Sequence, residues 1–386
     1  MWNKLKVVKQ PKDRSLLRKI LLMALVTLVV LGVVALIIFW DDLHMDAKIL
    51  RLKYWRAGGD ASYGTYSFDA HNSNCYADFD DGLAVASVGG LSTYTSDGRV
   101  AFVSQGQISL PQIKAAEDTV MAFDVGGNTL LALHKTNGEV LRVETEKAIL
   151  DADISADGDI CYVAPEGGYK SVLTVYNEKQ ELIFRWLSTS TFMPLCAVSE
   201  KGDSLAAIGL DQKDGSFSSV LNLFRTDTDQ IVKTVHLGSD LVYDLMYEND
   251  TICAVGENGV TYLSADGEVL QTYSYDGKYL KDFDDSGNGF LALSLNTYRA
   301  GNRYSLVVMD ETMEEPISVY IGREIIDLSA AGKYIAVLTT DGLTVYDRDL
   351  AVCSQTKNTE TATSVLMRPD GTALLLGGGT GRLYIP

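Results

Sequence analysis

A unit of four short strands recurs along this chain, and its clearest copy is the segment 325–352. Runs of β-branched and aromatic residues alternate there with turn signals such as Asp341-Gly342, where glycine accepts a positive φ without steric cost. The third run of this unit, Leu343–Tyr346, is repeated letter for letter at Leu173–Tyr176. Each unit is therefore expected to form an antiparallel meander of strands a, b, c and d.

The units begin roughly 35–48 residues apart, which is the period of four-stranded propeller blades. The last unit holds only three strands, and Tyr66–Asp69 is the candidate for its missing outer strand, which would leave no open sheet edge. We predict an all-β, eight-bladed propeller over residues 65–386. A seven-bladed ring, with the degenerate Ile113 unit merged into a neighbour, is the alternative. The eight units begin near Cys75, Ile113, Ile149, Leu195, Leu241, Leu280, Ile325 and Ser364.

The N-terminal segment has the composition of a membrane anchor. Residues 1–19 carry seven basic side chains against one Asp, a net charge of +6, and Ile20–Trp40 is an uncharged run. As a helix this run would span about 32 Å, close to the hydrocarbon thickness of a bilayer. A cleaved signal peptide is the alternative. We predict a single-pass anchor over 20–40 with a cytoplasmic tail, a membrane-proximal linker over 41–64 and an extracytoplasmic propeller at the cell membrane.

The body of the chain is strongly acidic. The whole chain carries a formal charge of −18, so residues 20–386 carry −24. Such a charge repels phosphate backbones, which argues against nucleic acid as a partner. The five cysteines lie far apart without metal-ligand spacing, and we interpret Cys161 and Cys253, which lie on expected b strands, as core residues.

The repeats resemble those of WD40-like and quinoprotein-like β-propellers over about residues 65–386. Together with the basic tail and the apolar run, they are similar to a family of membrane-anchored bacterial propellers of unknown function. The most similar passages are Ser109–Lys114, Phe123–Gly127 and Ser155–Gly158. The Gly-His and Trp-Asp signatures of WD40 repeats and the regular tryptophans of quinoprotein repeats are missing. The resemblance therefore implies a fold and a location, and no quinone cofactor.

An aspartate followed by an apolar residue recurs on the expected inner strands. Inner strands line the channel of a propeller, so one interpretation is an anionic ring that binds a cation or a basic ligand. The other is a structural role, in which each carboxylate accepts backbone N–H groups from the neighbouring blade. We favour the structural role. The residues are Asp78, Asp153, Asp244, Asp282 and Asp327.

No motif in the sequence indicates catalysis, a metal or a cofactor. Asp282–Asn288 is rich in carboxylates, but it does not match the twelve-residue calcium loop, and calcium is kept only as an alternative. The four histidines are scattered, without HxxxH spacing or a GxSxG serine.

Three b–c connections are longer than the others, at 165–170, 211–219 and 296–305. Tyr and Arg are enriched at binding hot spots, and loops on a rigid scaffold commonly carry function. We therefore expect a non-catalytic binding or scaffolding module for a protein or peptide at the cell surface. A hydrolase or lyase acting on a glycan or peptide at the channel, and a surface sensor with a membrane partner, are the alternatives. The candidate binding residues are Tyr169, Lys170, Phe217, Tyr298, Arg299, Arg303 and Tyr304.

Overall fold

The computed structural model describes residues 19, 22–23, 25–30, 64–213, 215–228, 230–359 and 361–386. The chain divides into two units, Met1–Lys53 and Tyr54–Pro386, and each is described by itself. In the first unit the described residues are helical, and the Thr27 hydroxyl donates to the Met23 carbonyl oxygen at 2.9 Å. Within the described residues, no helix is long and apolar enough to cross a membrane. Most of the expected anchor and nearly all of the expected linker lie outside the described residues, so both remain predictions.

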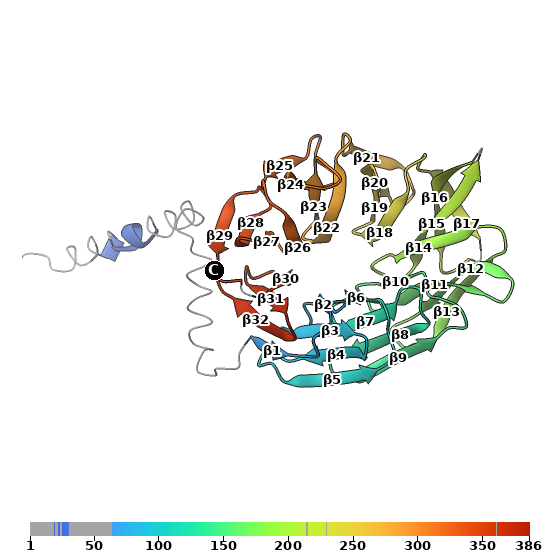
Figure 1. Cartoon of the computed structure of the whole chain (residues 1–386), viewed down its shortest axis with the longest axis horizontal. Coiled ribbons are helices and arrows are strands. Elements are labelled where there is room, and N and C mark those ends of the chain that lie inside the picture. Colours follow the sequence, from blue (N-terminus) through green and yellow to red (C-terminus); the bar gives the residue numbers. More distant parts are fainter. Residues whose placement is uncertain are drawn as a thin grey trace, which may run out of the picture. The chain divides into compact units, whose positions relative to one another are not determined.

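The second unit is a ring of eight antiparallel sheets with four strands each (Figure 1). The prediction of an eight-bladed propeller is confirmed, and the seven-bladed alternative is wrong. Blades 1–4 comprise β2 (Cys75–Ala77), β3 (Leu83–Ser87), β4 (Gly90–Tyr94) and β5 (Val100–Gln105); β6 (Pro111–Ala115), β7 (Thr119–Asp124), β8 (Thr129–His134) and β9 (Gly138–Glu144); β10 (Asp151–Ile154), β11 (Ile160–Glu166), β12 (Tyr169–Tyr176) and β13 (Leu182–Ser188); and β14 (Phe192–Val198), β15 (Ser204–Lys213), β16 (Ser216–Arg225) and β17 (Ile231–His236).

Blades 5–8 continue the ring in sequence order, and the eighth is completed by the first strand of the chain. They comprise β18 (Val242–Glu248), β19 (Thr251–Gly256), β20 (Gly259–Ser264) and β21 (Val269–Ser274); β22 (Tyr279–Gly287), β23 (Phe290–Asn296), β24 (Tyr304–Met309) and β25 (Ile317–Tyr320); β26 (Ile325–Ala331), β27 (Tyr334–Thr339), β28 (Gly342–Asp347) and β29 (Val352–Thr356); and β30 (Ser364–Met367), β31 (Ala373–Gly377), β32 (Thr380–Tyr384) and β1 (Thr65–Ser67).

The ring is closed where β1 pairs with β32. Thr65 lies opposite Arg382 and Ser67 lies opposite Thr380 in an antiparallel register. The predicted outer strand of the last blade is thus present. Because β1 and the rest of blade 8 come from opposite ends of the propeller sequence, this pairing joins the two ends and leaves no free edge between blades 8 and 1.

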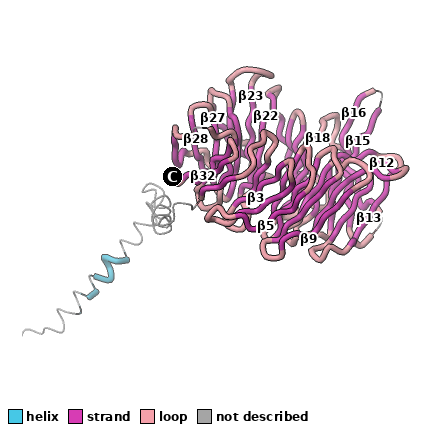
Figure 2. Tube along the Cα trace, turned by 60° about the horizontal axis from the view of Figure 1, so that its bottom comes forward, coloured by secondary structure: helices cyan, strands magenta, loops and turns pink. Residues whose placement is uncertain are grey.

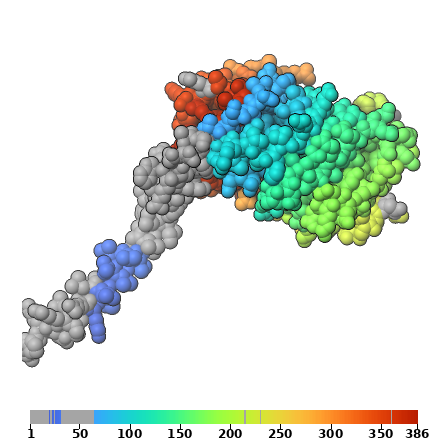
Figure 3. All heavy atoms as spheres, turned by 90° about the horizontal axis from the view of Figure 1, so that it is seen from below, coloured from blue at the N-terminus to red at the C-terminus, as the bar shows by residue number. Residues whose placement is uncertain are grey.

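The core lies between neighbouring blades. Middle strands such as β23 and β31 are buried along their whole length, whereas outer strands such as β25 alternate between half-buried and exposed residues. This difference follows from position, because middle strands have a blade on each side and outer strands face solvent. In the side view of Figure 3, the blades drawn from blue to green lie side by side in sequence order.

The antiparallel order of each blade creates two distinct faces. Connections between strands b and c, and between strand d and the next strand a, lie on one side of the ring, which we call the b–c face. Connections a–b and c–d lie on the other side, the a–b face. The turn at Gly342 shows how tightly the short b–c connections fit: φ is +144°, and a Cβ there would lie 2.2 Å from the Thr356 carbonyl oxygen.

Candidate functional site

Two of the five repeated aspartates bond to the inner strand of the following blade. Asp153 Oδ2 accepts the Val198 N–H at 2.9 Å, and Asp327 Oδ2 accepts the Val365 N–H at 2.7 Å. A further residue, Asp284, accepts the Ala330 N–H at 3.1 Å in the same way. Each of these carboxylates ties the inner strand of one blade to that of the next.

The other three repeated aspartates make additional or different contacts. Asp244 and Asp282 accept the N–H of the residue that follows them, at 2.8 and 3.0 Å. The backbone N–H of Leu328, on the inner strand of blade 7, also lowers the pKa of Asp282. Asp78 instead forms an ion pair with Arg368 of blade 8, whose Nε lies 2.9 Å from Asp78 Oδ1. The recurring pair of an aspartate and an apolar residue therefore occurs with several local arrangements. The sequence repeat alone does not distinguish these arrangements.

The channel contains a lysine among carboxylates that sequence reasoning did not single out. Lys114 on β6 donates to Asp153 Oδ1 at 2.9 Å. Burial alone would lower the pKa of Lys114, but the charges of Asp153, Asp151 and Asp244 raise it well above its usual value. Lys114 lies in the degenerate strand of the second unit, and only its position on an inner strand could have indicated a channel residue.

Several channel carboxyls hold their protons more strongly than free aspartate does. Burial raises the pKa of Asp151 to about 7 although Lys114 opposes the shift. Burial and the neighbouring Asp327 raise the pKa of Asp282 to about 7, and burial with Asp284 and Glu248 raises that of Asp285 to about 8. The negative charge of the channel is thus only partly compensated by Lys114.

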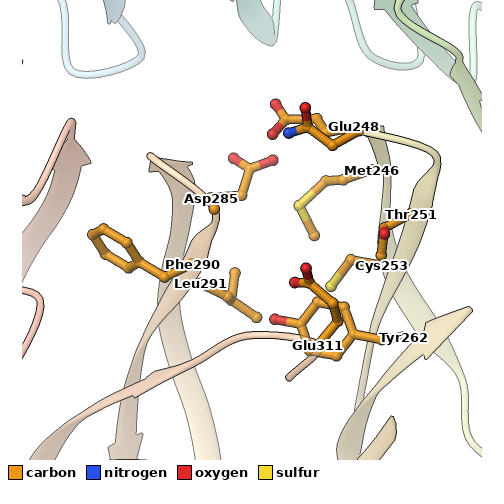
Figure 4. Close-up of a pocket in the computed structure, with 11 residues that line it drawn as sticks. Met246, Glu248, Thr251, Cys253, Tyr262, Asp285, Phe290, Leu291 and Glu311 are labelled. Atoms are coloured by element: carbon orange, nitrogen blue, oxygen red, sulfur yellow. The ribbon is translucent and has the colours of Figure 1, made fainter. Parts of the chain in front are cut away.

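A cavity of about 80 Å³ lies between blades 5 and 6 at the a–b face (Figure 4). Glu248 and Thr251 flank the a–b turn of blade 5, Gly289 lies in that of blade 6, and Glu311 follows β24. These segments are far apart in sequence, which explains why no motif predicted the cavity.

The candidate binding residues lie on the b–c face, with one exception. Tyr169 and Lys170 begin β12, and the Lys170 ammonium donates to the Ser190 carbonyl oxygen at 2.9 Å. Phe217 lies on β16 in the long hairpin that projects from the ring in Figure 2, and its side chain is 52% exposed. Tyr304 begins β24, and its side chain is buried in the core between blades 6 and 7. Its side chain is therefore not exposed on the b–c face.

The loop between β23 and β24 is ordered by its own side chains. The Asn296 amide donates to the Gly301 carbonyl oxygen at 2.7 Å, and the Arg303 guanidinium lies over the Tyr298 ring at 5.7 Å from its centroid. The Arg299 carbonyl oxygen accepts from Lys281 Nζ at 2.8 Å. These contacts hold exposed Tyr298 in a defined position, which lowers the entropic cost of binding.

All the exposed aromatic side chains in the described part of the chain lie on the b–c face. They come from four consecutive blades, 3 to 6, and several lie at the starts of inner strands or the ends of outer strands, positions that loop length does not reveal. The residues are Tyr169, Phe192, Phe217, Tyr243, Tyr279, Tyr298 and Tyr320.

The described residues contain no group of three or more His, Cys, Asp or Glu side chains arranged to hold a metal ion. The acidic segment 282–288 lies mainly on β22 and not in a turn, which removes the loop geometry on which the calcium alternative depended.

A sequence model described as a family of unknown function (DUF5711) matches residues 61–369. No curated protein matches the sequence. Among solved structures, the computationally designed protein Ika8 is similar with a TM-score of 0.62 and 11% identity, over 84% of this chain and 100% of that one. Hydrazine synthase of Kuenenia stuttgartiensis gives a TM-score of 0.49 and 11% identity, over 71% of this chain and 94% of that one. At 11% identity, the likeness to Ika8 shows the fold alone.

Proposed function

The chain belongs to the family of unknown function DUF5711, and we propose from its own geometry that it is a membrane-anchored, extracytoplasmic propeller that binds a protein or peptide partner without catalysing a reaction. The observation that carries the proposal is the arc of seven exposed aromatic side chains on the b–c face of blades 3–6. Exposed aromatic residues are unfavourable in water and are enriched at interfaces between proteins. We call this surface the aromatic arc.

The surroundings of the aromatic arc favour a peptide or protein over a small ligand. The arc extends over four blades, whereas the cavity between blades 5 and 6 and the one between blades 2 and 3 have their linings on the a–b side of the blades. An extended surface with rigid aromatic side chains is typical of protein interfaces, whereas small ligands bind in concave pockets.

The membrane location is supported by the sequence. The basic segment 1–19 followed by the uncharged run 20–40 has the charge asymmetry of an anchor with a cytoplasmic N-terminus. A tag placed after Pro386 should be digested by external protease in intact cells. Protection of the tag until the cells are lysed would contradict the proposed orientation.

Site-specific photo-crosslinking in cells tests the binding surface. A photoreactive phenylalanine analogue at Phe217 or Tyr298 should capture one specific protein, which is then identified. The same analogue at Val232 or Leu270, which are exposed near the a–b ends of outer strands, is the matched control. Equal capture from both pairs of positions, or none from Phe217 and Tyr298, would overturn the proposal.

The binding affinity of a double variant shows whether the crosslinked residues contribute to recognition of the partner or only lie near it. Phe217→Ser combined with Tyr298→Ser should weaken binding of the captured partner at least thirtyfold, because a buried aromatic hot spot contributes about 2 kcal/mol or more. The purified chain should show no turnover of glycan or peptide substrates. Turnover that is lost with Asp151→Asn would instead support the hydrolase or lyase alternative.

A further inference from the structure

The cavity between blades 5 and 6 combines an apolar wall with two polar ends. Met246, Leu291 and Cys253 form the wall (Figure 4). In the same view the carboxylates of Glu248 and Asp285 lie together at one end. At the other end, the Glu311 carboxylate lies beside the hydroxyl of Tyr262. This site lies on the a–b face, and its argument does not rest on the function proposed for the aromatic arc.

Tyr262 is the feature that points to a ligand. Its side chain is 5% exposed, and its hydroxyl points into the cavity. Within the described structure that hydroxyl makes no well-aligned hydrogen bond, and its partner is the thiol of Cys253, which is only a weak hydrogen-bonding group. A buried hydroxyl with so weak a partner costs free energy that a bound polar group would recover.

The three carboxylates of the cavity are available to a bound cation. Within the described residues, no Lys or Arg nitrogen lies within ion-pairing distance of Glu248, Asp285 or Glu311. Burial and the neighbouring acids raise the pKa of Asp285 to about 8 although the charge of Lys114 opposes the shift, so the negative charge around Asp285 is undercompensated. The apolar wall and the absence of a three-ligand cluster argue against a hard metal ion as the missing cation.

We propose that this cavity binds a short alkane carrying an ammonium group at each end. One ammonium lies between Glu248 and Asp285, and the other lies between the Tyr262 hydroxyl and Glu311. The methylene chain packs against Met246 and Leu291. Ammonium groups donate three hydrogen bonds each and need acceptors, which carboxylates and the phenol oxygen provide. The small volume of the cavity excludes a folded peptide and suits a chain of a few carbons.

Calorimetric titration of the full-length chain in detergent tests the two ends and the wall separately. The probe is 1,5-diaminopentane, which should bind saturably at one site. Pentylamine lacks one ammonium and should bind about tenfold more weakly. Pentane-1,5-diol has the same shape without charge and should show no measurable binding. Nα-acetyl-lysine methylamide also carries a single ammonium, so binding as tight as that of the diamine would overturn the two-ended site.

Substitutions locate the binding within the cavity. Asp285→Asn and Tyr262→Phe should each weaken diamine binding about tenfold, since each removes one polar contact and keeps the shape of the side chain. Glu315→Gln, an exposed acid beyond β24, is the control for charge. Tyr275→Phe is the control for the phenol, because the Tyr275 hydroxyl is also buried and has no hydrogen-bond partner among the described residues, but Tyr275 lies outside the cavity lining.

The control variants should bind the diamine as the unsubstituted chain does. If all four variants bind equally, the diamine associates with the acidic surface in general and the proposal is wrong. Absence of any saturable heat with 1,5-diaminopentane would also overturn it. Thermal unfolding of each variant confirms that weaker binding does not reflect a loss of fold.

Discussion

The b–c face of the ring presents exposed aromatic side chains, whereas carboxylates gather in the channel and at the two ends of the cavity at the a–b face. Phe217 and Tyr298 extend into solvent from long connections. Asp151 and Asp285 instead lie on inner strands, where burial between neighbouring blades raises the pKa of both carboxyls. The aromatic residues can change without disturbing the blades, while the charged residues are part of the packing between blades.

This difference separates the region that determines stability from the region to which we assign the proposed binding. Contacts that cross from blade to blade, such as buried Arg368 with half-buried Asp78, hold the ring together. Contacts on the b–c face, such as Arg303 with Tyr298, stay within one loop. Substitutions should therefore reduce stability in the first region and binding in the second.

The largest loss of stability is expected for Arg368→Met. The Arg368 guanidinium pairs with Asp78 and donates to the Gly82 carbonyl oxygen, so it joins blade 8 to blade 1. Removing one partner of a buried pair leaves an uncompensated charge, and the free energy of unfolding should fall by about 3–5 kcal/mol. Urea unfolding measures this change. Arg382→Met, an exposed arginine on the same blade, should cost less than about 1 kcal/mol, and equal losses would contradict the role of the closure.

The second-largest loss of stability is expected for Lys114→Met, and this loss should depend on pH. Lys114 stabilises the ionised forms of Asp151 and Asp244, whose pKa values are raised by burial, so its removal is most costly at a pH where those two carboxyls are ionised. We expect a loss of about 2–3 kcal/mol at pH 8 and a clearly smaller loss at pH 5. Unfolding midpoints at both pH values provide the measurement. A loss independent of pH would mean that Lys114 acts through packing alone.

Asp151→Asn should increase the free energy of unfolding, whereas Lys114→Met should decrease it. Since the pKa of Asp151 is raised to about 7 in the folded state, the folded chain binds this proton more tightly than the unfolded chain does, and stability falls as the pH rises from about 4 to 7. Asparagine does not titrate and still accepts the Cys196 N–H. The variant should be more stable by roughly 1–2 kcal/mol at pH 8 and unchanged at pH 4. Exposed Asp211→Asn is the control, and a gain at pH 4 would refute the assignment.

The smallest effect on stability is expected for Phe217→Ser. Its ring is largely exposed on the projecting hairpin, so the unfolding midpoint should shift by less than about 0.5 kcal/mol. Binding of the partner should nevertheless fall. A large loss of stability with unchanged binding would reverse the roles assigned to the two faces.

The architecture was largely readable from the sequence because it depends on local patterns. Four strands per unit follow from turn residues between β-branched runs, and the three-stranded last unit predicted the closing strand that the structure places at Thr65–Ser67. Tyr304 was misplaced because it was counted with a loop, whereas the Asn296–Tyr304 pairing makes it the first residue of a buried strand.

The sequence by itself determined the repeat, the number of blades and the position of the long b–c connections, since each depends on residues close together in the chain. Only the tertiary structure decided that Lys114 faces three aspartates, that Arg368 closes the ring and that Tyr262 and Glu311 meet Asp285 around one cavity. These groupings arise between blades, where residues tens to hundreds of positions apart come together. No local pattern encodes which side chains of neighbouring blades face each other.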